Sequence, residues 1–360
     1  MKLIVEPDDK LLPLLNAIDR ARKSLQIAIF RFDSKEMERA LKNAVKRGVS
    51  VQALIASTNG NAENSLRRLE TRLLDYGIAV VRTGDSLTRY HDKLMIVDGK
   101  ELFLVAFNFT HLDTDRSRSF GIATRNRELV EEAARLYATD AQRQNYTEKT
   151  GRLVVSPLNA RKKLAGFLRR ARKQLLIYDP KISDREMIRV LEKLAQAGVE
   201  IKIIGKLTNC RQALEVRELA HLRLHTRTMI RDGRVAFIGS QSLRKTELDS
   251  RREAGVIFRD RAVVNRLSKI FQDDWAAAVP KRLEEVRPSE TIASTAKQVS
   301  KTVVEELPPI APALKSALEE IAGVHLGNSL DRREVEAKVK GTVKQAVAAA
   351  VESVVKDLVE

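Results

Sequence analysis

Two hydrophobic periods alternate along the chain between its start and residue 280. Residues 25–30 form a nearly continuous apolar run, which is typical of a buried strand. Apolar residues then recur at Met37, Leu41 and Ala44, and this spacing of about 3.6 residues predicts an amphipathic helix. Gly48 predicts the end of that helix, and the apolar run 49–55 predicts a second strand. Strand, helix and strand in this order predict an α/β fold with some parallel pairing.

The same pattern returns later in the chain. Residues 21–51 and 171–201 align without gaps, at an offset of 150, and 11 of the 31 positions are identical. The shared residues include the Ala-Arg-Lys start of each segment, a Glu-Met pair and a glycine, Gly48 or Gly198. We therefore infer a duplicated unit of about 130 residues. The first copy is longer than the second between its Thr-Asn pair and its next shared motif.

This duplication predicts two similar half-domains, each a mixed β-sheet flanked by helices, over residues 1–148 and 149–280. A helical tail with a Pro-rich linker at 307–312 would occupy residues 281–360. Apolar residues recur at helix or heptad spacing within 342–359, which predicts an amphipathic helix packed on the body. Self-association and attachment to a membrane surface are alternatives, although the stretch lacks the basic face expected at membranes.

The net charge of +17 lies in the duplicated part of the chain. Residues 281–360 carry 12 basic and 13 acidic residues, so residues 1–280 have a net charge of +18. Such a charge favours anionic partners, namely nucleic acid, anionic lipid headgroups or phosphate esters, although a highly soluble surface would have the same composition. Aromatic residues are only 4% of the chain, which argues against a protein that stacks single-stranded bases on aromatic rings.

The single cysteine, Cys210, excludes an intrachain disulfide and a zinc site built from paired cysteines. No group of acidic and histidine residues has metal-ligand spacing, so we expect neither a metal nor a cofactor. Residues 1–10 lack the apolar run of a signal peptide, and no stretch approaches the ~20 apolar residues of a membrane span. We therefore expect a cytoplasmic protein, with peripheral contact to a membrane left open.

The two halves also share a polar motif. Residues 91–99 read His-Asp-Lys-Leu-Met-Ile-Val-Asp-Gly, and residues 225–233 read His-Thr-Arg-Thr-Met-Ile-Arg-Asp-Gly. In an extended strand, residues two apart point to one side, so His91 and Lys93 share a face, as do His225 and Arg227. The Asp-Gly pair at the end of each motif predicts a hairpin turn, and a β-rich run follows each turn.

A register for the first hairpin follows from this turn. If Gly99 and Lys100 form a two-residue loop, Asp98 pairs with Glu101 and His91 lies opposite Asn108. The same register would place His225 opposite Ser242. Each half would then present a histidine, a cation and a small polar group, a combination suited to a phosphate centre. A register shift of one residue would move these side chains away from one another, so that they no longer form one site.

A plainer interpretation is that Asp98 and Asp232 are only turn residues and that Lys93 is a solvated strand lysine. Two matches at equivalent places in two repeats favour a functional site instead.

These motifs resemble those of the phospholipase D superfamily. His91, Lys93, Asp98 and Asn108 are similar to its first motif, and His225, Asp232 and the Gly239-Ser240 pair to its second. The resemblance covers roughly residues 1–280, and it implies two phospholipase D-like half-domains and a two-step reaction through a covalent phosphohistidine, without metal.

The resemblance also implies roles. His91 would be the nucleophile and His225 the general acid and base, while Lys93 and Asn108 would hold the phosphoryl oxygens. Arg227 and Ser242 would do the same in the second half. Glu253, which lies downstream of the second motif, is similar to the acidic residue that orients an imidazole in this family. The expected catalytic set is His91, His225, Lys93, Arg227, Asp98, Asp232 and Glu253.

The chain departs from the family pattern in four places. Arg227 replaces a lysine, and Ser242 replaces an asparagine. Ser119 stands at the same distance after His91 as Glu253 does after His225, so the first half has a serine where the second has the acidic residue. The usual Gly-Ser pair of the first half is Val105-Ala106. Arginine keeps the charge and can bind phosphate with two donors, but it is not a point donor like lysine.

Three hypotheses follow. The first is a phosphodiesterase that cleaves or transfers a phospholipid headgroup, and the second is a nuclease of the same superfamily. The third is a binder of anionic lipid or nucleic acid whose second motif has decayed at Arg227 and Ser242. Both motifs lie in one chain, so an oligomer is not required to complete the site.

Overall fold

The computed structural model describes residues 1–57, 63–84, 86–208, 210, 214–280, 341–343, 345–347 and 349–350. The chain divides into two compact units, Met1–Lys281 and Arg282–Glu360. The described residues of the second unit are helical, whereas the expected linker at 307–312 lies outside the described residues. Among the described helices, none is long and apolar enough to cross a bilayer.

The first half of the Met1–Lys281 unit alternates strands and helices. Its elements are β1 (Lys2–Glu6), α1 (Leu12–Arg20), β2 (Ser24–Ile29), α2 (Lys35–Lys46), β3 (Ser50–Ile55), α3 (Glu63–Asp75), β4 (Ala79–Arg82), β5 (Arg89–Tyr90), β6 (Leu94–Val97), β7 (Glu101–Val105), α4 (His111–Arg116), β8 (Ser117–Thr124) and α5 (Arg127–Ala141).

The second half repeats this order, except that no described helix lies where α3 lies in the first. Its elements are β9 (Leu153–Ser156), α6 (Ala160–Arg169), β10 (Gln174–Ile182), α7 (Arg185–Gln196), β11 (Glu200–Leu207), β12 (Glu215–Glu218), β13 (Arg223–Leu224), β14 (Arg227–Arg231), β15 (Val235–Gly239), α8 (Lys245–Asp249), β16 (Arg251–Phe258), α9 (Arg261–Ala277) and β17 (Val279–Pro280).

Each half builds one mixed sheet. The first has the strand order β1-β8-β7-β6-β2-β3-β4, and the second has the order β17-β12-β11-β10-β14-β15-β16-β5, with β9 also paired to β16. The strand–helix–strand segments form parallel pairs, β2 with β3 and β10 with β11. The predicted α/β fold of two similar half-domains is confirmed.

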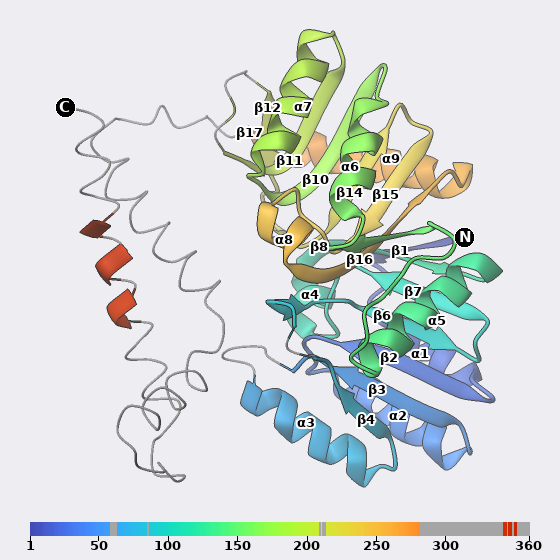
Figure 1. Ribbon diagram of the computed structural model, residues 1–360. Helices are drawn as coiled ribbons and strands as arrows, with labels where there is room; N and C mark the ends of the chain where they lie inside the picture. The colour runs from blue at the N-terminus through green and yellow to red at the C-terminus, as the bar shows by residue number, and fades with distance from the viewer. Residues whose placement is uncertain are drawn as a thin grey trace. The chain divides into compact units, whose positions relative to one another are not determined.

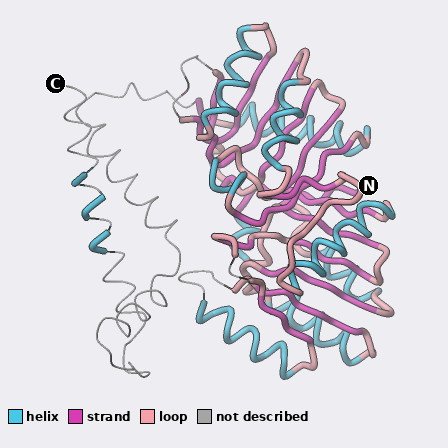
Figure 2. The backbone as a smooth tube through the Cα atoms, viewed as in Figure 1, coloured by secondary structure: helices cyan, strands magenta, loops and turns pink. Residues whose placement is uncertain are grey.

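Three large apolar clusters hold the described sheets and helices together. One packs α1, α2 and α3 on the outer face of the first sheet, and another packs α6 and α7 on the outer face of the second. A third contains residues of both sheets together with α5 and α9, so it joins the halves. Figure 2 shows the strands as an inner block with helices along its outer sides. Full burial of one large aliphatic side chain contributes about 1.5–3 kcal/mol, so this shared core fixes one half on the other.

The repeated helices start and end in the same way. The Ser34 side chain accepts a hydrogen bond from the backbone N–H of Met37 and caps α2, and Asp184 caps α7 in the same manner. Gly48 and Gly198 follow these helices with φ of 84° and 82°, a left-handed conformation that glycine adopts without steric cost. The glycine shared by the two repeats therefore reflects the way in which these helices end.

The register of both hairpins differs from the prediction by one residue. Val97 pairs with Glu101 and Arg231 with Val235, so Asp98 does not pair with Glu101. Asp98 has a φ of 53° and therefore belongs to the turn rather than to the strand. The predicted placements of His91 opposite Asn108 and His225 opposite Ser242 in a continuous ladder are thus wrong. The residues still gather, because both histidines precede the regular strands β6 and β14.

Candidate active site

The two halves exchange short strands directly before their histidines. β5 of the first half pairs with β16 of the second, and the next residue, His91, donates its backbone N–H to the Arg252 carbonyl at 2.8 Å. In the same way, β13 of the second half pairs with β8 of the first, and the His225 N–H donates to the Arg118 carbonyl at 3.1 Å. Each histidine is therefore anchored on the sheet of the other half.

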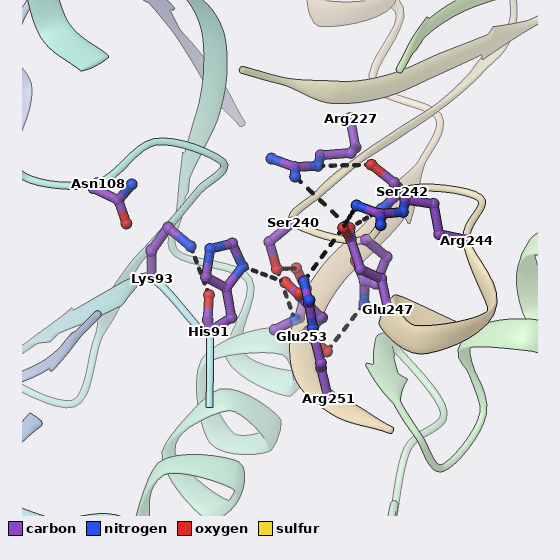
Figure 3. A network of polar contacts seen from close by, with 12 residues as sticks. His91, Lys93, Asn108, Arg227, Ser240, Ser242, Arg244, Glu247, Arg251 and Glu253 are labelled. Carbon is purple, nitrogen blue, oxygen red and sulfur yellow. Dashed lines mark hydrogen bonds and ion pairs between the residues drawn. The ribbon is translucent and has the colours of Figure 1, made fainter. Parts of the chain in front are cut away.

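The imidazole of His91 is held by Glu253. Nδ1 of His91 lies 2.7 Å from Oε2 of Glu253, and both side chains are buried (Figure 3). The ring of Phe30 packs against the imidazole edge-on, with the ring centroids 4.4 Å apart. A neutral imidazole that donates Nδ1–H to this carboxyl group keeps a lone pair on Nε2, which is what a nucleophile needs.

The pKa values of this pair shift in opposite directions. Burial, followed by the charge of Lys93, lowers the pKa of His91 well below its usual value. Burial and the nearby Glu247 raise the pKa of Glu253 to about 8. Both shifts disfavour charge on the buried pair, so His91 is held in its neutral form.

The imidazole of His225 lies beside Asp113, at the start of α4. Nδ1 of His225 and Oδ2 of Asp113 are 3.2 Å apart, although the two groups are not aligned as a hydrogen bond. Asp113 is 1% exposed and also contacts the guanidinium of Arg223. Burial, followed by the charges of Arg227 and Arg223, lowers the pKa of His225 well below its usual value. The carboxylate beside each histidine therefore comes from the opposite half.

The motif cations occupy equivalent positions in the two halves. Nζ of Lys93 donates to the His91 carbonyl at 2.7 Å, and the Arg227 guanidinium donates to the His225 carbonyl at 3.1 Å. Lys93 is 2% exposed, and burial lowers its pKa to about 7. Arg227 also lies 3.7 Å from Glu247. The solvated-lysine interpretation of Lys93 is therefore wrong.

The small polar residues Asn108 and Ser242 follow the same plan. The backbone N–H and the side-chain amide of Asn108 donate to Asp113 at 2.6 and 2.7 Å. The backbone N–H of Ser242 donates to Glu247 at 2.7 Å, and its hydroxyl accepts from Nε of Arg227 at 3.1 Å (Figure 3). The structure thus brings a histidine, a cation and a small polar group together in each half.

Asp98 and Asp232 lie elsewhere, at the turn end of each hairpin. Asp98 accepts hydrogen bonds from the backbone N–H groups of Arg22, Lys23 and Ser24 at 2.7–3.1 Å. Asp232 does the same with residues 172–174, at 2.7–3.1 Å. The strand that separates Lys93 from Asp98 spans about 16 Å at the usual rise. These carboxylates therefore bind the backbone at the turns, away from the histidines, and their expected catalytic role stays a prediction.

Two departures from the family pattern have visible structural counterparts. Val105 lies opposite Gly121, and a Cβ on Gly121 would come within 2.5 Å of the Val105 side chain, so the missing side chain makes room for the valine. Ser119 is fully buried, and its hydroxyl has no hydrogen-bond partner among the described residues. The carboxylate near His225 comes instead from Asp113, which precedes Ser119 in the chain.

The sequence reasoning missed Asp113 and Glu247. Asp113 follows His91 at the same distance along the chain as Glu247 follows His225, so the offset between the motifs held the signal. Arg251 and Arg244 also went unnoticed, and each forms an ion pair with Glu247, at 3.5 and 3.4 Å. In the part of the chain that the structure describes, no cluster of three or more His, Cys, Asp and Glu side chains is arranged to hold a metal ion.

Comparisons with known proteins match both halves. The family model "Cardiolipin synthase, PLD-like domain" matches residues 14–140 and 164–275. A phospholipase D of Rickettsia felis is 33% identical over 119 residues, which are 33% of this chain and 57% of the relative. A mitochondrial cardiolipin hydrolase of Danio rerio is 31% identical over 121 residues, 32% of this chain and 50% of the relative. The chain thus spans about half the length of these relatives.

Among solved structures, phosphatidylserine synthase from Haemophilus influenzae Rd KW20 matches with a TM-score of 0.60 and 14% identity, over 85% of this chain and 94% of the other. That likeness shows a shared fold across both halves. The family model covers about two thirds of the chain and includes both histidine motifs. The chain therefore belongs to the phospholipase D superfamily, as a two-half member of its phospholipase D-like domain family.

Proposed function

We propose that this protein is a phosphodiesterase that hydrolyses or transfers a phospholipid headgroup through a phosphohistidine on His91. The arrangement of the two histidines carries the proposal. One comes from each half, both are buried or nearly so, and each has Nδ1 within 3.2 Å of a carboxylate of the opposite half. This leaves the Nε2 atoms of the two rings to act on the substrate.

In the first step, Nε2 of His91 attacks phosphorus and forms a P–N bond. The bond from phosphorus to the headgroup oxygen breaks, and His225 gives that oxygen a proton from Nε2. His225 must be protonated for this role, and the arginines around it oppose that charge. A bound phosphodiester is negative and offsets them, so substrate binding itself raises the pKa of His225.

In the second step, the neutral His225 removes a proton from water or from an acceptor alcohol. The resulting oxygen attacks phosphorus, the P–N bond breaks and His91 is restored. Each step needs stabilisation of charge on the phosphoryl oxygens. We assign this stabilisation to four side chains near the histidines, Lys93, Arg227, Asn108 and Ser242.

The names of related proteins support a lipid substrate. The family description names cardiolipin synthase, and the relatives include a cardiolipin hydrolase and a phospholipase D. A nuclease remains the second candidate, because the net charge of +18 on residues 1–280 also suits a nucleic acid backbone. The bonded geometry of Arg227 and Ser242 favours a working second motif over a decayed one.

The test compares wild type with His91→Asn on labelled phosphatidylglycerol, phosphatidylcholine and duplex DNA, with a chelator present. Release of headgroup by wild type alone supports the proposal. His225→Asn should lose headgroup release as well, because it lacks both the acid of the first step and the base of the second. Cleavage of DNA without headgroup release would assign a nuclease, and absence of turnover on every substrate would favour the binding protein.

A further inference from the structure

Helices α2 and α3 belong to the first half and are drawn in blue at the bottom of Figure 1. Their side chains, together with residues 32 and 33, line a hollow of about 610 Å³. Its lining includes five cationic side chains, Lys35, Arg39, Lys42, Arg68 and Arg72, and two carboxylates, Asp33 and Glu38. We call it the α2–α3 groove. The side chains that line it have a net charge of +3, which favours an anionic ligand.

Both carboxylates of the groove are already occupied. Glu38 accepts two hydrogen bonds from Arg72, at 2.7 and 3.0 Å, and one from the Tyr76 hydroxyl at 3.1 Å. Asp33 accepts from the backbone N–H of His111 at 2.9 Å. These contacts balance the charge of Arg72 and hold the Glu38 and Asp33 side chains in place along the groove.

The four other cations of the groove form no hydrogen bond to a carboxylate of the described residues, and Nζ of Lys42 lies over the Tyr76 ring, 4.3 Å from its centroid. Lys35 and Arg39 are exposed and form no hydrogen bond or ion pair with any residue that the structure describes. Arg68 donates to a backbone carbonyl, that of Asn64, at 3.3 Å. Lys35, Arg39 and Lys42 are spaced i, i+4 and i+7 on one face of α2, so they extend over about 10 Å. A stripe of this length suits one or two phosphate groups rather than a long strand of nucleic acid.

The groove adjoins the active site through Phe109. The Phe32 and Phe109 rings pack edge-on with centroids 6.2 Å apart. The backbone N–H groups of Asp33 and Ser34 donate to the Phe109 carbonyl at 3.0 and 3.3 Å. Phe109 directly follows Asn108, so the end of the groove at Phe32 and Asp33 is bonded to the segment that carries Asn108.

The second half does not repeat the groove among its described residues. Its equivalent helix α7 carries Arg185 and Arg189 at the positions of Lys35 and Arg39, but Glu192 replaces Lys42. No helix is described between β11 and β12, where the first half has α3. The chain therefore supplies this cationic wall on one side of a site that is otherwise nearly two-fold symmetric.

We propose that the α2–α3 groove is a second anion subsite, which binds an additional phosphate group in the headgroup of the phospholipid substrate. This rests on the proposed function and deepens it. The reacting phosphate would lie between His91 and His225, and the second phosphate would lie against Lys35, Arg39 and Arg68. Lipids with a second headgroup phosphate would then be preferred over otherwise identical lipids with one.

The test uses phosphatidylcholine vesicles that contain either phosphatidylinositol or phosphatidylinositol monophosphate, which differ by one phosphate. Wild type should bind and cleave the monophosphate lipid at least about tenfold better, since charge-assisted hydrogen bonds of this kind contribute about 1.5–3 kcal/mol. Lys35→Gln/Arg39→Gln should lose most of this preference. Arg185→Gln/Arg189→Gln removes the same charge from equivalent positions on α7 and should retain it.

Soluble inositol bisphosphate should compete for the wild type and not for the α2 variant, which separates headgroup binding from attraction to a charged membrane. Equal losses in the two double variants, or an α2 variant that keeps the preference, would overturn the subsite. Loss of DNA binding in the α2 variant, with its lipid preference intact, would assign the groove to nucleic acid instead. If wild type cleaves neither inositol lipid but still releases the headgroup of phosphatidylglycerol, the proposed function stands and vesicle binding decides the subsite. If it cleaves no phospholipid at all, the proposed function fails, and vesicle binding again decides the subsite.

Discussion

Oε2 of Glu253 lies 2.7 Å from Nδ1 of His91, although the two residues are 162 positions apart in the chain. The carboxyl group stands on β16 of the second half, and the histidine directly follows β5 of the first, which pairs with that same strand. The orientation of the proposed nucleophile is therefore set by a residue of the other half.

Replacement of Glu253 by glutamine should lower kcat by about 10²-fold or more, with a smaller effect on KM. The amide keeps the size of the side chain but cannot release a proton to become the carboxylate that would balance the positive charge of a phosphorylated His91 ring. Steady-state kinetics on headgroup release measures this. Activity close to wild type would show that His91 needs no carboxylate.

Asp113→Asn should slow formation of the phosphoenzyme more than its breakdown, because formation needs His225 in its protonated form. The asparagine can still accept hydrogen bonds from Asn108, but it lacks the charge that favours protonated His225. Rapid-quench measurement of the phosphorylated enzyme separates the two steps.

A second-site change gives the matched control. Ser119 occupies the position that Glu253 has in the other half, so Asp113→Asn/Ser119→Glu should recover part of the lost rate. Ser119→Glu alone should bring little gain. An equal loss in the single and double variants would mean that Asp113 acts only through the fold.

The pH dependence of anion binding should report Lys93. Burial lowers its pKa to about 7, so the ammonium is present below that pH and is lost above it. Sulfate remains a dianion over this range, so its binding should weaken as the pH rises through about 7 and Lys93 loses its charge. Lys93→Met should bind sulfate weakly at all these pH values, as isothermal titration calorimetry can show. A wild-type affinity that does not change with pH would contradict the assignment.

Asp98→Ala should destabilise the fold by about 1–3 kcal/mol and leave kcat almost unchanged, because three backbone N–H groups lose their acceptor. Asp232→Ala is the equivalent change in the second half. Denaturant unfolding and kinetics of the same samples measure both effects. A large fall in kcat without loss of stability would instead support a catalytic role for these two aspartates.

The same aspartates predict how stability depends on pH. Burial alone would raise the pKa of Asp98, but hydrogen bonds from Ser24, Lys23 and Arg22 lower it below the ordinary value of 3.8. A folded-state pKa below the unfolded value stabilises the fold above that unfolded value, and the contribution is lost as the pH falls through the folded one. Wild type should therefore lose stability below about pH 4 more steeply than Asp98→Ala.

Hydrophobic periodicity predicted the elements that form locally. The helix spacing at Met37 and Leu41, the caps at Gly48 and Gly198 and the strands beside them all follow from contacts between near neighbours in the chain. The one-residue error in the hairpins arose because the Asp98 side chain binds the backbone at residues 22–24, which draws Asp98 into the turn. No periodic pattern within the hairpin itself records such a contact.

The site residues that belong to the repeated motif could be predicted from the sequence. The contacts that one half makes with the other could not be predicted in this way. His91, Lys93, His225 and Arg227 share a spacing that can be seen in one chain. The pairing of β5 with β16 involves two residues, too few to leave a hydrophobic pattern. Asp113 was missed for a related reason, since its contact with His225 joins the two halves. The position equivalent to Glu253, where a carboxylate was expected, is Ser119 instead.

The exchange of β5 and β13 also determines when the proposed site becomes complete during synthesis of the chain. The ribosome makes His91 first, but the strand that holds its backbone and the carboxyl group that holds its ring come from residues 251–258. Domains generally fold in order as they emerge, so a nascent chain that ends before this strand has an imidazole without its support. The proposed site is thus completed only when residues 251–258 have been made, and chains that end before them should be inert toward phosphodiesters.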